Sequence, residues 1–155
     1  ISDLLFMDRL IARLAGSPWC RRLVLEATEE AFIEADVLRD TVLPKLKAAG
    51  IKLSIDDFGR GYSSLATLAD VPADELKVDR AFITAIDRRP RNQSVLKAIE
   101  SLGGALGMTV VAEGIETAAE LDYLLQRTSI REGQGFLLQR PFFLDEATID
   151  CSEAA

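Results

Sequence analysis

The chain has 155 residues, of which 48% are hydrophobic and 28% charged, and its formal net charge is −7. These proportions exclude a disordered chain and are typical of one globular domain with a buried core. The acidic balance argues against a nucleic-acid groove, because binding to a phosphate backbone needs clustered cations. The sequence contains no histidine and only two cysteines, Cys20 and Cys151. A zinc tetrad and a histidine-based catalytic relay are therefore excluded within the chain.

Membrane association is not expected from the sequence. No apolar run approaches the roughly 18 residues that a membrane-spanning helix needs. The start, Ile1-Ser2-Asp3, has neither the basic flank nor the apolar segment of a signal peptide. We therefore expect no membrane insertion and a cytoplasmic location, which the low cysteine count also favours.

Helical and strand patterns alternate through the first part of the chain. In order, the sequence predicts a helix from Leu4 to Leu14 that stops at Gly16, a strand over Leu23–Leu25 followed by Glu26, a helix over Val37–Ala49 closed by Gly50, and a strand over Leu53–Ile55 followed by Asp56. Pro44 must either kink the second helix or mark its start, because proline lacks a backbone N–H.

The alternation continues in the second part. The sequence predicts a strand over Leu76–Asp79, a helix over Asn92–Leu106 before Gly107, a strand over Thr109–Ala112 followed by Glu113, a helix over Ala118–Gln126, and a last strand over Gly135–Leu138 opened by Gln134 and closed by Pro141. The first of these strands alternates apolar with charged side chains, which predicts one packed face and one polar face.

Strands that alternate with helices predict a parallel sheet, and near-continuous apolar strands predict that both of its faces are covered. Two folds satisfy this pattern: a doubly wound sheet and a (β/α)₈ barrel. Charged or amide side chains stand at one end of most strands, namely Glu26, Asp56, Asp57, Lys77, Asp79, Glu113 and Gln134. Most of them follow the C-terminal end, where barrel enzymes carry their chemistry. A doubly wound nucleotide fold would place a Gly-x-Gly-x-x-Gly loop after its first strand, and none follows here.

Asp56 and Asp57 form the most informative pair in the sequence. Adjacent carboxylates at a strand end repel each other unless a positive charge lies between them, and a divalent cation supplies that charge. The residue types available favour oxygen ligands and hard metals, Mg²⁺ or Mn²⁺. On local sequence alone, a structural role as turn acids that cap a helix at Ser63-Ser64 is equally compatible.

Two further polar residues also allow a structural interpretation. Lys77 could form a buried ion pair with Asp79 or Glu113. Glu113, which lies within Ala-Glu-Gly after a buried strand, could cap the next turn. These alternatives remain open at the level of local sequence.

The motifs taken together resemble the EAL-domain cyclic di-GMP phosphodiesterases. The resemblance covers nearly the whole chain and rests on Leu25-Glu26-Ala27-Thr28-Glu29, Asp56-Asp57-Phe58-Gly59, Gly61-Tyr62-Ser63-Ser64-Leu65, Leu76-Lys77-Val78-Asp79-Arg80, Val111-Ala112-Glu113-Gly114-Ile115-Glu116-Thr117 and Gln134-Gly135-Phe136. It implies a (β/α)₈ barrel of the TIM type and hydrolysis of cyclic di-GMP to linear pGpG in bacterial second-messenger signalling, with two divalent cations, Mg²⁺ or Mn²⁺.

The resemblance also implies a role for each matching residue. Metal ligands would be Glu26, Asp56, Asp57 and Glu113, with Asp56 bridging the two ions. Lys77 and Glu113 would be catalytic, Lys77 by orienting or deprotonating the attacking water. Gln134 and Asp79 would bind substrate, and Glu29 would anchor the loop from Asp57 to Ser64, which couples metal binding to dimer packing. A homodimer, and fusion to sensory or GGDEF-type domains in the parent protein, are expected with it.

The sequence departs from the family pattern in its extent. The Glu-Ala-Leu motif that names the family is missing from the 155 residues, and a full barrel takes about 250 residues. We therefore interpret residues 1–155 as the C-terminal part of a single EAL domain, with about the last five βα units. Arg60 and Glu30 replace a threonine and a serine usual in the family.

Two alternative functions are considered. One is a catalytically incompetent EAL-like module that binds nucleotide or a partner protein, and the other is a non-catalytic fragment that self-associates.

Overall fold

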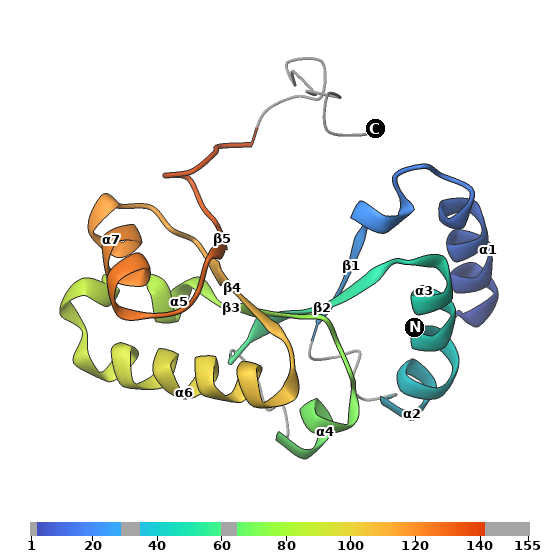
Figure 1. Cartoon of the computed structure of the whole chain (residues 1–155), viewed down its shortest axis with the longest axis horizontal. Helices are drawn as coiled ribbons and strands as arrows, with labels where there is room; N and C mark the ends of the chain where they lie inside the picture. Colours follow the sequence, from blue (N-terminus) through green and yellow to red (C-terminus); the bar gives the residue numbers. More distant parts are fainter. Residues whose placement is uncertain (1–2, 29–34, 60–64, 142–155) are drawn as a thin grey trace.

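A computed structural model describes residues 3–28, 35–59 and 65–141 (Figure 1). Five strands form its sheet: β1 (Val24–Ala27), β2 (Lys52–Phe58), β3 (Glu75–Val78), β4 (Thr109–Glu113) and β5 (Glu132–Gln134). The α-helices are α1 (Leu4–Ala15), α2 (Ala35–Val37), α3 (Leu43–Ala49), α4 (Leu65–Asp70), α5 (Arg80–Ile83), α6 (Pro90–Leu106) and α7 (Ala118–Arg127). Shorter turns of other helix types are η1 (Cys20–Arg22), η3 (Leu38–Val42) and η4 (Ile86–Arg88).

The order of the strands distinguishes between the two folds left by the sequence. All four neighbouring pairs are parallel, and the spatial order is β1-β2-β3-β4-β5, the same as the order along the chain. A doubly wound sheet reverses its order at a switch point, whereas a barrel winds in one direction. Figure 1 shows the helices on the convex side of the curved sheet, to its right, below it and to its left. The described sheet is thus a five-stranded arc of the barrel type.

The two faces of the sheet differ sharply in polarity. Residues opposite each other in parallel strands share a face, and so do residues two apart in one strand. One face carries Leu53, Ile55, Leu76, Val78 and Ala112, all fully buried beneath the helices. The opposite, concave face carries Glu26, Ser54, Asp56, Glu75, Lys77, Glu113 and Gln134. The helices cover only the first of these faces, but Ser54, Glu75 and Lys77 on the concave face are buried as well. The expectation that both faces are covered therefore holds for the central strands β2 and β3.

Most predicted helices are confirmed, with small shifts at their ends. α1 is capped by Asp3, whose carboxylate accepts a hydrogen bond from the Phe6 N–H at 2.8 Å. Gly50 and Gly107 end α3 and α6 in the left-handed conformation, with φ of 75° and 73°. α6 starts two residues earlier than predicted, because Pro90 occupies its first turn, where a missing N–H costs no hydrogen bond.

Pro44 neither simply kinks the helical stretch around it nor simply marks its start. Helical structure runs from Ala35 to Ala49, but the turn Leu38–Val42 is a π-helix, and Pro44 lies within the first two positions of α3. The wider turn allows the chain to continue past a residue that has no N–H to donate. Leu38, Val42 and Leu46 along this stretch are all buried.

The last predicted strand is misplaced. β5 covers Glu132–Gln134, whereas residues 135–138 form a turn in which the Gly135 carbonyl accepts from the N–H groups of Leu138 and Gln139. The cause lies in the neighbouring strand, because β4 ends at Glu113 and Gly114 turns the chain away at φ 69°. Gly135 then packs directly on the Ile115 backbone, where an added Cβ would lie 2.2 Å from its nitrogen.

The two edge strands, β1 and β5, are more exposed than the central strands. Val24 of β1 is 39% exposed, and the three residues of β5 are all exposed. Each edge strand has one neighbour in the described sheet, so its outer side gains no packing. Among the described helices, none is both long and apolar enough to cross a membrane.

Candidate active site

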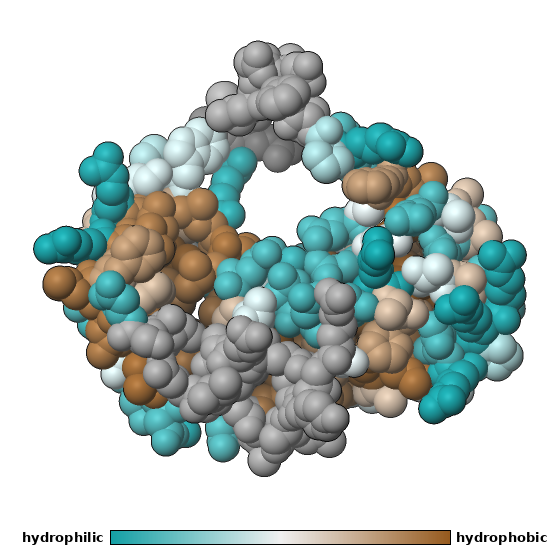
Figure 2. All heavy atoms as spheres, turned by 180° about the vertical axis from the view of Figure 1, so that it is seen from behind, coloured by the Kyte–Doolittle hydropathy of each residue, from teal (hydrophilic) through white to brown (hydrophobic). Residues whose placement is uncertain are grey.

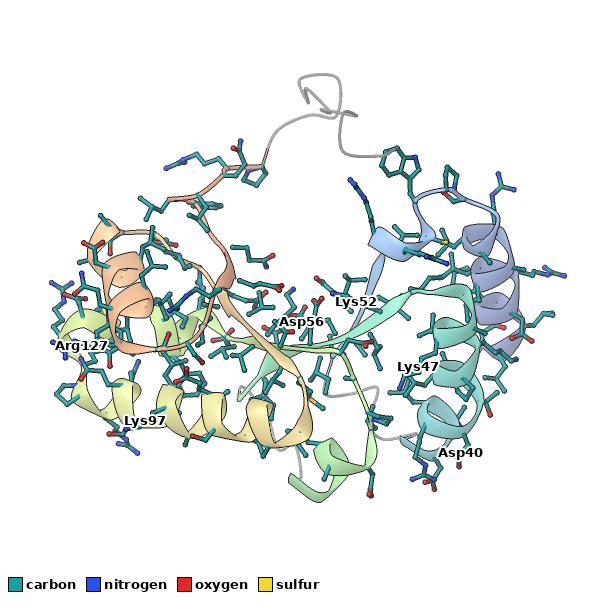
Figure 3. The ribbon with its side chains drawn as sticks, in the orientation of Figure 1. Asp40, Lys47, Lys52, Asp56, Lys97 and Arg127 are labelled. Atoms are coloured by element: carbon teal, nitrogen blue, oxygen red, sulfur yellow. The ribbon has the colours of Figure 1, made fainter. Side chains whose placement is uncertain are left out.

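The polar side chains predicted from the sequence meet at the carboxyl ends of the strands. Glu26 comes from β1, Asp56 and Asp57 from β2, Lys77 from β3, Glu113 from β4 and Gln134 from β5. Figure 2 shows a hollow on the concave side of the sheet, with hydrophilic side chains gathered beneath it. In Figure 3, Asp56 and Lys52 both lie along this side. The same edge of five successive strands thus carries one concentrated polar cluster, which we call the carboxylate cluster.

A bulge in β2 explains how two adjacent acids can serve one face. Ile55 pairs with Leu76 and Phe58 with Val78, so β2 uses three steps where β3 uses two. Strict alternation would direct neighbouring side chains to opposite faces, but the extra residue breaks it. Asp57 occupies the left-handed region at φ 56°. Its backbone N–H donates to the Asp56 carboxylate at 2.9 Å, which holds the bulge in shape.

Lys77 lies at the centre of the cluster. Its Nζ is 2.7 Å from Oε1 of Glu26, 3.1 Å from Oδ1 of Asp56 and 2.8 Å from Oε1 of Glu113. The Lys77 side chain is only 7% exposed, whereas that of Glu26 is 50% exposed. One ammonium therefore joins three strands, and the buried ion pair with Glu113 that local sequence allowed is present as part of a larger network.

Gln134 extends the network to the last strand. Its Nε2 donates to Oε1 of Glu113 at 2.6 Å, and the two residues are direct partners in the β4–β5 pairing. The same Glu113 oxygen accepts from Lys77, so this carboxylate is held from two sides. Its orientation is thus fixed by hydrogen bonds from two neighbouring strands, rather than by the turn that follows it.

The protonation of the cluster reflects an excess of acids. Burial lowers the pKa of the Lys77 ammonium, but its carboxylate partners raise it, and the net shift is upward. Burial raises the pKa of Glu113, Lys77 lowers it, and the charges of Asp56 and Asp57 raise it further, so the net shift is again upward. A single ammonium cannot neutralise all the surrounding carboxylates. The cluster keeps surplus negative charge that a further cation would neutralise.

The donor set fits a hard divalent cation. Asp56, Asp57 and Glu113 each offer a carboxylate oxygen, and the three oxygens lie within 4.8 Å of one another. Carboxylate oxygens are the ligands that Mg²⁺ and Mn²⁺ prefer in proteins. Glu26 reaches the same cluster through Lys77. All four residues expected as metal ligands therefore belong to one connected group of side chains.

The remaining predicted site residues have other positions. Asp79 directly follows β3 and is buried, and its carboxylate caps α5 by accepting from the Ala81 N–H at 2.8 Å. Its role in substrate binding remains a prediction. Glu29, the expected loop anchor, and Arg60 lie outside the described residues.

Two buried polar residues escaped the sequence interpretation. Glu120 is 4% exposed and accepts from the backbone N–H groups of Ala85, Glu116 and Thr117. The spacing Thr117-x-x-Glu120 before an apolar helix is a capping-box pattern that could have revealed it. Ser54 is fully buried on the concave face, and within the described residues its Oγ has no hydrogen-bond partner. No sequence signal marks it.

Comparison with known proteins agrees with this fold and cluster. The family model of the EAL domain matches residues 1–141. The cyclic di-GMP phosphodiesterase PdeR of Escherichia coli is 42% identical over 117 residues, which cover 76% of this chain and 18% of PdeR. A solved structure of the PaMucR phosphodiesterase in complex with c-di-GMP is 43% identical with a TM-score of 0.72, over 81% of this chain and 50% of that one. A manganese and cy-diGMP complex of Klebsiella pneumoniae BlrP1 is 38% identical with a TM-score of 0.69, over 86% and 33%.

The parallel arc with acids at its carboxyl edge defines an α/β barrel-type domain. The chain belongs to the EAL-domain family. It spans about a fifth of the length of the relative PdeR and half of the solved PaMucR chain.

Proposed function

We propose that this chain is part of a metal-dependent phosphodiesterase that hydrolyses cyclic di-GMP to linear pGpG. The observation that carries the proposal is the convergence of Asp56, Asp57 and Glu113 within 4.8 Å beside Lys77 at one edge of the sheet. Two similar proteins support the proposal: PdeR is named a cyclic di-GMP phosphodiesterase, and the PaMucR structure is a c-di-GMP complex.

Asp56, Asp57 and Glu113 would hold a divalent cation directly, and Glu26 would complete the cluster for a second one. When bound, such cations supply Lewis-acid polarisation of the phosphodiester and lower the pKa of water. The BlrP1 manganese complex supports Mn²⁺ as one suitable ion.

Lys77 would act on the attacking water as a hydrogen-bond donor and as a positive charge. Its raised pKa keeps the amine protonated, so it is better suited to orient water than to remove a proton. In hydrolysis the water oxygen forms a bond to phosphorus as the bond from phosphorus to the ribose 3′ oxygen breaks. The 3′ oxygen gains a proton, and the product is the linear dinucleotide.

Gln134 would hold the Glu113 carboxylate in place through its amide Nε2. Its amide Oε1 would be available to bind substrate. Asp79, which caps α5 and lies two residues after Lys77, would bind substrate. We further propose that the active form is a homodimer. We also propose that the domain operates within a larger signalling protein, because PdeR is several times longer than the region that matches.

The decisive experiment measures release of pGpG from cyclic di-GMP in Mn²⁺ or Mg²⁺. We compare the chain with Asp56→Asn and with Asp122→Asn, an exposed acid on α7 that serves as a matched control. Loss of turnover in Asp56→Asn alone supports the proposal. Equal turnover in both variants overturns it, and binding of cyclic di-GMP without any hydrolysis favours the alternative of a catalytically incompetent module.

A further inference from the structure

One short helix contacts the turns that follow both acid-bearing strands. α5 (Arg80–Ile83) starts directly after β3, and the Asp79 carboxylate caps its first turn. The turn after β2 contains Gly59, two residues beyond Asp57, and the turn after β4 contains Gly114, next to Glu113. Both glycines have positive φ, of 99° and 69°. A single helical turn therefore lies between the two segments that carry the carboxylates.

Phe82 packs against the first of these turns. A Cβ built on Gly59 would lie 2.6 Å from Cε2 and 3.1 Å from Cζ of Phe82, so the ring occupies the space that a side chain would need. Phe82 itself is half-buried. A rigid aromatic ring in this position limits how far the Gly59 backbone can move, and Asp57 is only two residues away.

Arg80 packs against the second turn. A Cβ on Gly114 would lie 2.4 Å from Cβ and 3.4 Å from Cα of Arg80. These are atoms of the backbone and of the stem of the side chain, which cannot swing away. The peptide that follows Glu113 is therefore pressed against the start of α5.

A third contact fixes the far end of the same segment. The Glu120 carboxylate accepts from the Ala85 N–H at 2.7 Å with one oxygen, and from Glu116 and Thr117 at 3.0 and 2.9 Å with the other. Ala85 has a φ of 57°. The residues after α5 are thus tied to the residues after Gly114 by one buried carboxylate, so α5 cannot shift independently of the Glu113 turn.

We propose that α5 is a positioning element for the carboxylate cluster, in which Phe82 sets the turn after Asp57 and Arg80 sets the turn after Glu113. This inference rests on the proposed metal site. Metal affinity depends steeply on ligand geometry, and changes in residues that support ligands typically cost 10–100-fold in affinity or activity. α5 would act through backbone position, without touching metal or substrate.

The first test replaces Phe82 by leucine and measures the Kd for Mn²⁺ by electron paramagnetic resonance, together with the melting temperature. Ile83→Val is the matched control, because Ile83 lies on the same helical turn but is fully buried on the core side. We expect both variants to melt at a lower temperature, and only Phe82→Leu to weaken Mn²⁺ binding, by roughly tenfold. An unchanged Kd in Phe82→Leu, or an equal loss in both variants, overturns the inference.

The second test compares two glycines of similar backbone conformation. Gly114→Ala and Gly107→Ala both force alanine into positive φ, at 69° and 73°, but an added Cβ meets Arg80 only at Gly114 and nothing within 4 Å at Gly107. We expect the Mn²⁺ Kd to rise in Gly114→Ala alone. Equal Kd values for the two variants contradict a positioning role. Failure of the unmodified chain to bind Mn²⁺ overturns the proposed metal site itself, and the inference with it.

Discussion

Nζ of Lys77 on β3 lies 2.7 Å from Oε1 of Glu26 on β1, across the intervening strand β2. Neighbouring strands are about 4.8 Å apart, so the two side chains together span about twice that distance. A long flexible cation is one of the few side chains that can reach this far and still be held at the carboxyl edge of the sheet.

Replacing Lys77 by methionine should destabilise the metal-free chain. Removing one partner of a buried ion pair costs about 3–5 kcal/mol, and the half-exposed Glu26 reduces this, so we expect about 2 kcal/mol from urea unfolding. Mn²⁺ should recover part of the loss, because it neutralises the same carboxylates. Lys97→Met, at an exposed position on α6, is the control and should change little. If the Lys77→Met chain were as stable as this control, the ion pairs of Lys77 would not stabilise the metal-free fold.

Divalent cations should stabilise the chain through the carboxylate cluster. A ligand that binds only the folded state at 100 times its Kd adds about 2.7 kcal/mol of stability. We therefore expect Mn²⁺ to raise the melting temperature measured by circular dichroism, and EDTA to reverse the rise. Asp56→Asn should respond less than the unmodified chain. A response of equal size in Asp56→Asn would place the binding elsewhere.

The Glu120 carboxylate should make stability depend on acid pH. Burial raises its pKa, but hydrogen bonds from the backbone N–H groups of Ala85, Glu116 and Thr117 outweigh burial and lower it below the ordinary 4.5. A carboxyl whose pKa is lower in the folded than in the unfolded state stabilises above the unfolded pKa, and loses that contribution as pH falls through the folded pKa.

Urea unfolding of Glu120→Gln and of the unmodified chain should therefore differ most near neutral pH. We expect a loss of about 1–3 kcal/mol there, because an amide group cannot accept all three bonds, and the two curves should converge as pH falls below 4.5. A difference that stays constant across this range would show that the charge of Glu120 is not what matters.

Adjacent glycines in α6 should respond oppositely to alanine. A Cβ on Gly103 would lie 2.4 Å from Cγ2 of Val110 on β4, whereas a Cβ on Gly104 meets nothing within 4 Å. Overpacking costs about 1–3 kcal/mol, and alanine in a helix is favoured over glycine by about 1 kcal/mol. Thermal unfolding should show Gly104→Ala stabilised and Gly103→Ala destabilised. If both variants were stabilised, α6 would not approach β4 as closely as described.

The sequence contained enough information to predict the parallel barrel-type sheet, the longer helices and the residues of the cluster, but not every strand end. Helix ends at Gly50 and Gly107 follow from glycine's access to positive φ, which acts locally. Glu26, Lys77 and Glu113 could be brought together because carboxyl ends of parallel strands share an edge. β5 was misplaced because its end depends on contacts with Gly114 and Ile115 in the turn after β4, and no local pattern encodes such contacts. The polar face of residues 76–79 was predicted from their alternation, but the buried Ser54 on the same face was missed, because apolar neighbours conceal a single polar residue.

The bulge between Ile55 and Phe58 has a consequence for how such a site could arise or be transferred. Inserting one residue into a strand lets that strand contribute two carboxylates to one face, while Ile55 and Phe58 stay packed against the helices on the other. Ligand density at a strand end can thus rise without any change to the hydrophobic core. The same one-residue insertion, placed at the carboxyl end of another parallel strand, offers a simple route to grafting a paired-acid cation site onto a scaffold that lacks one.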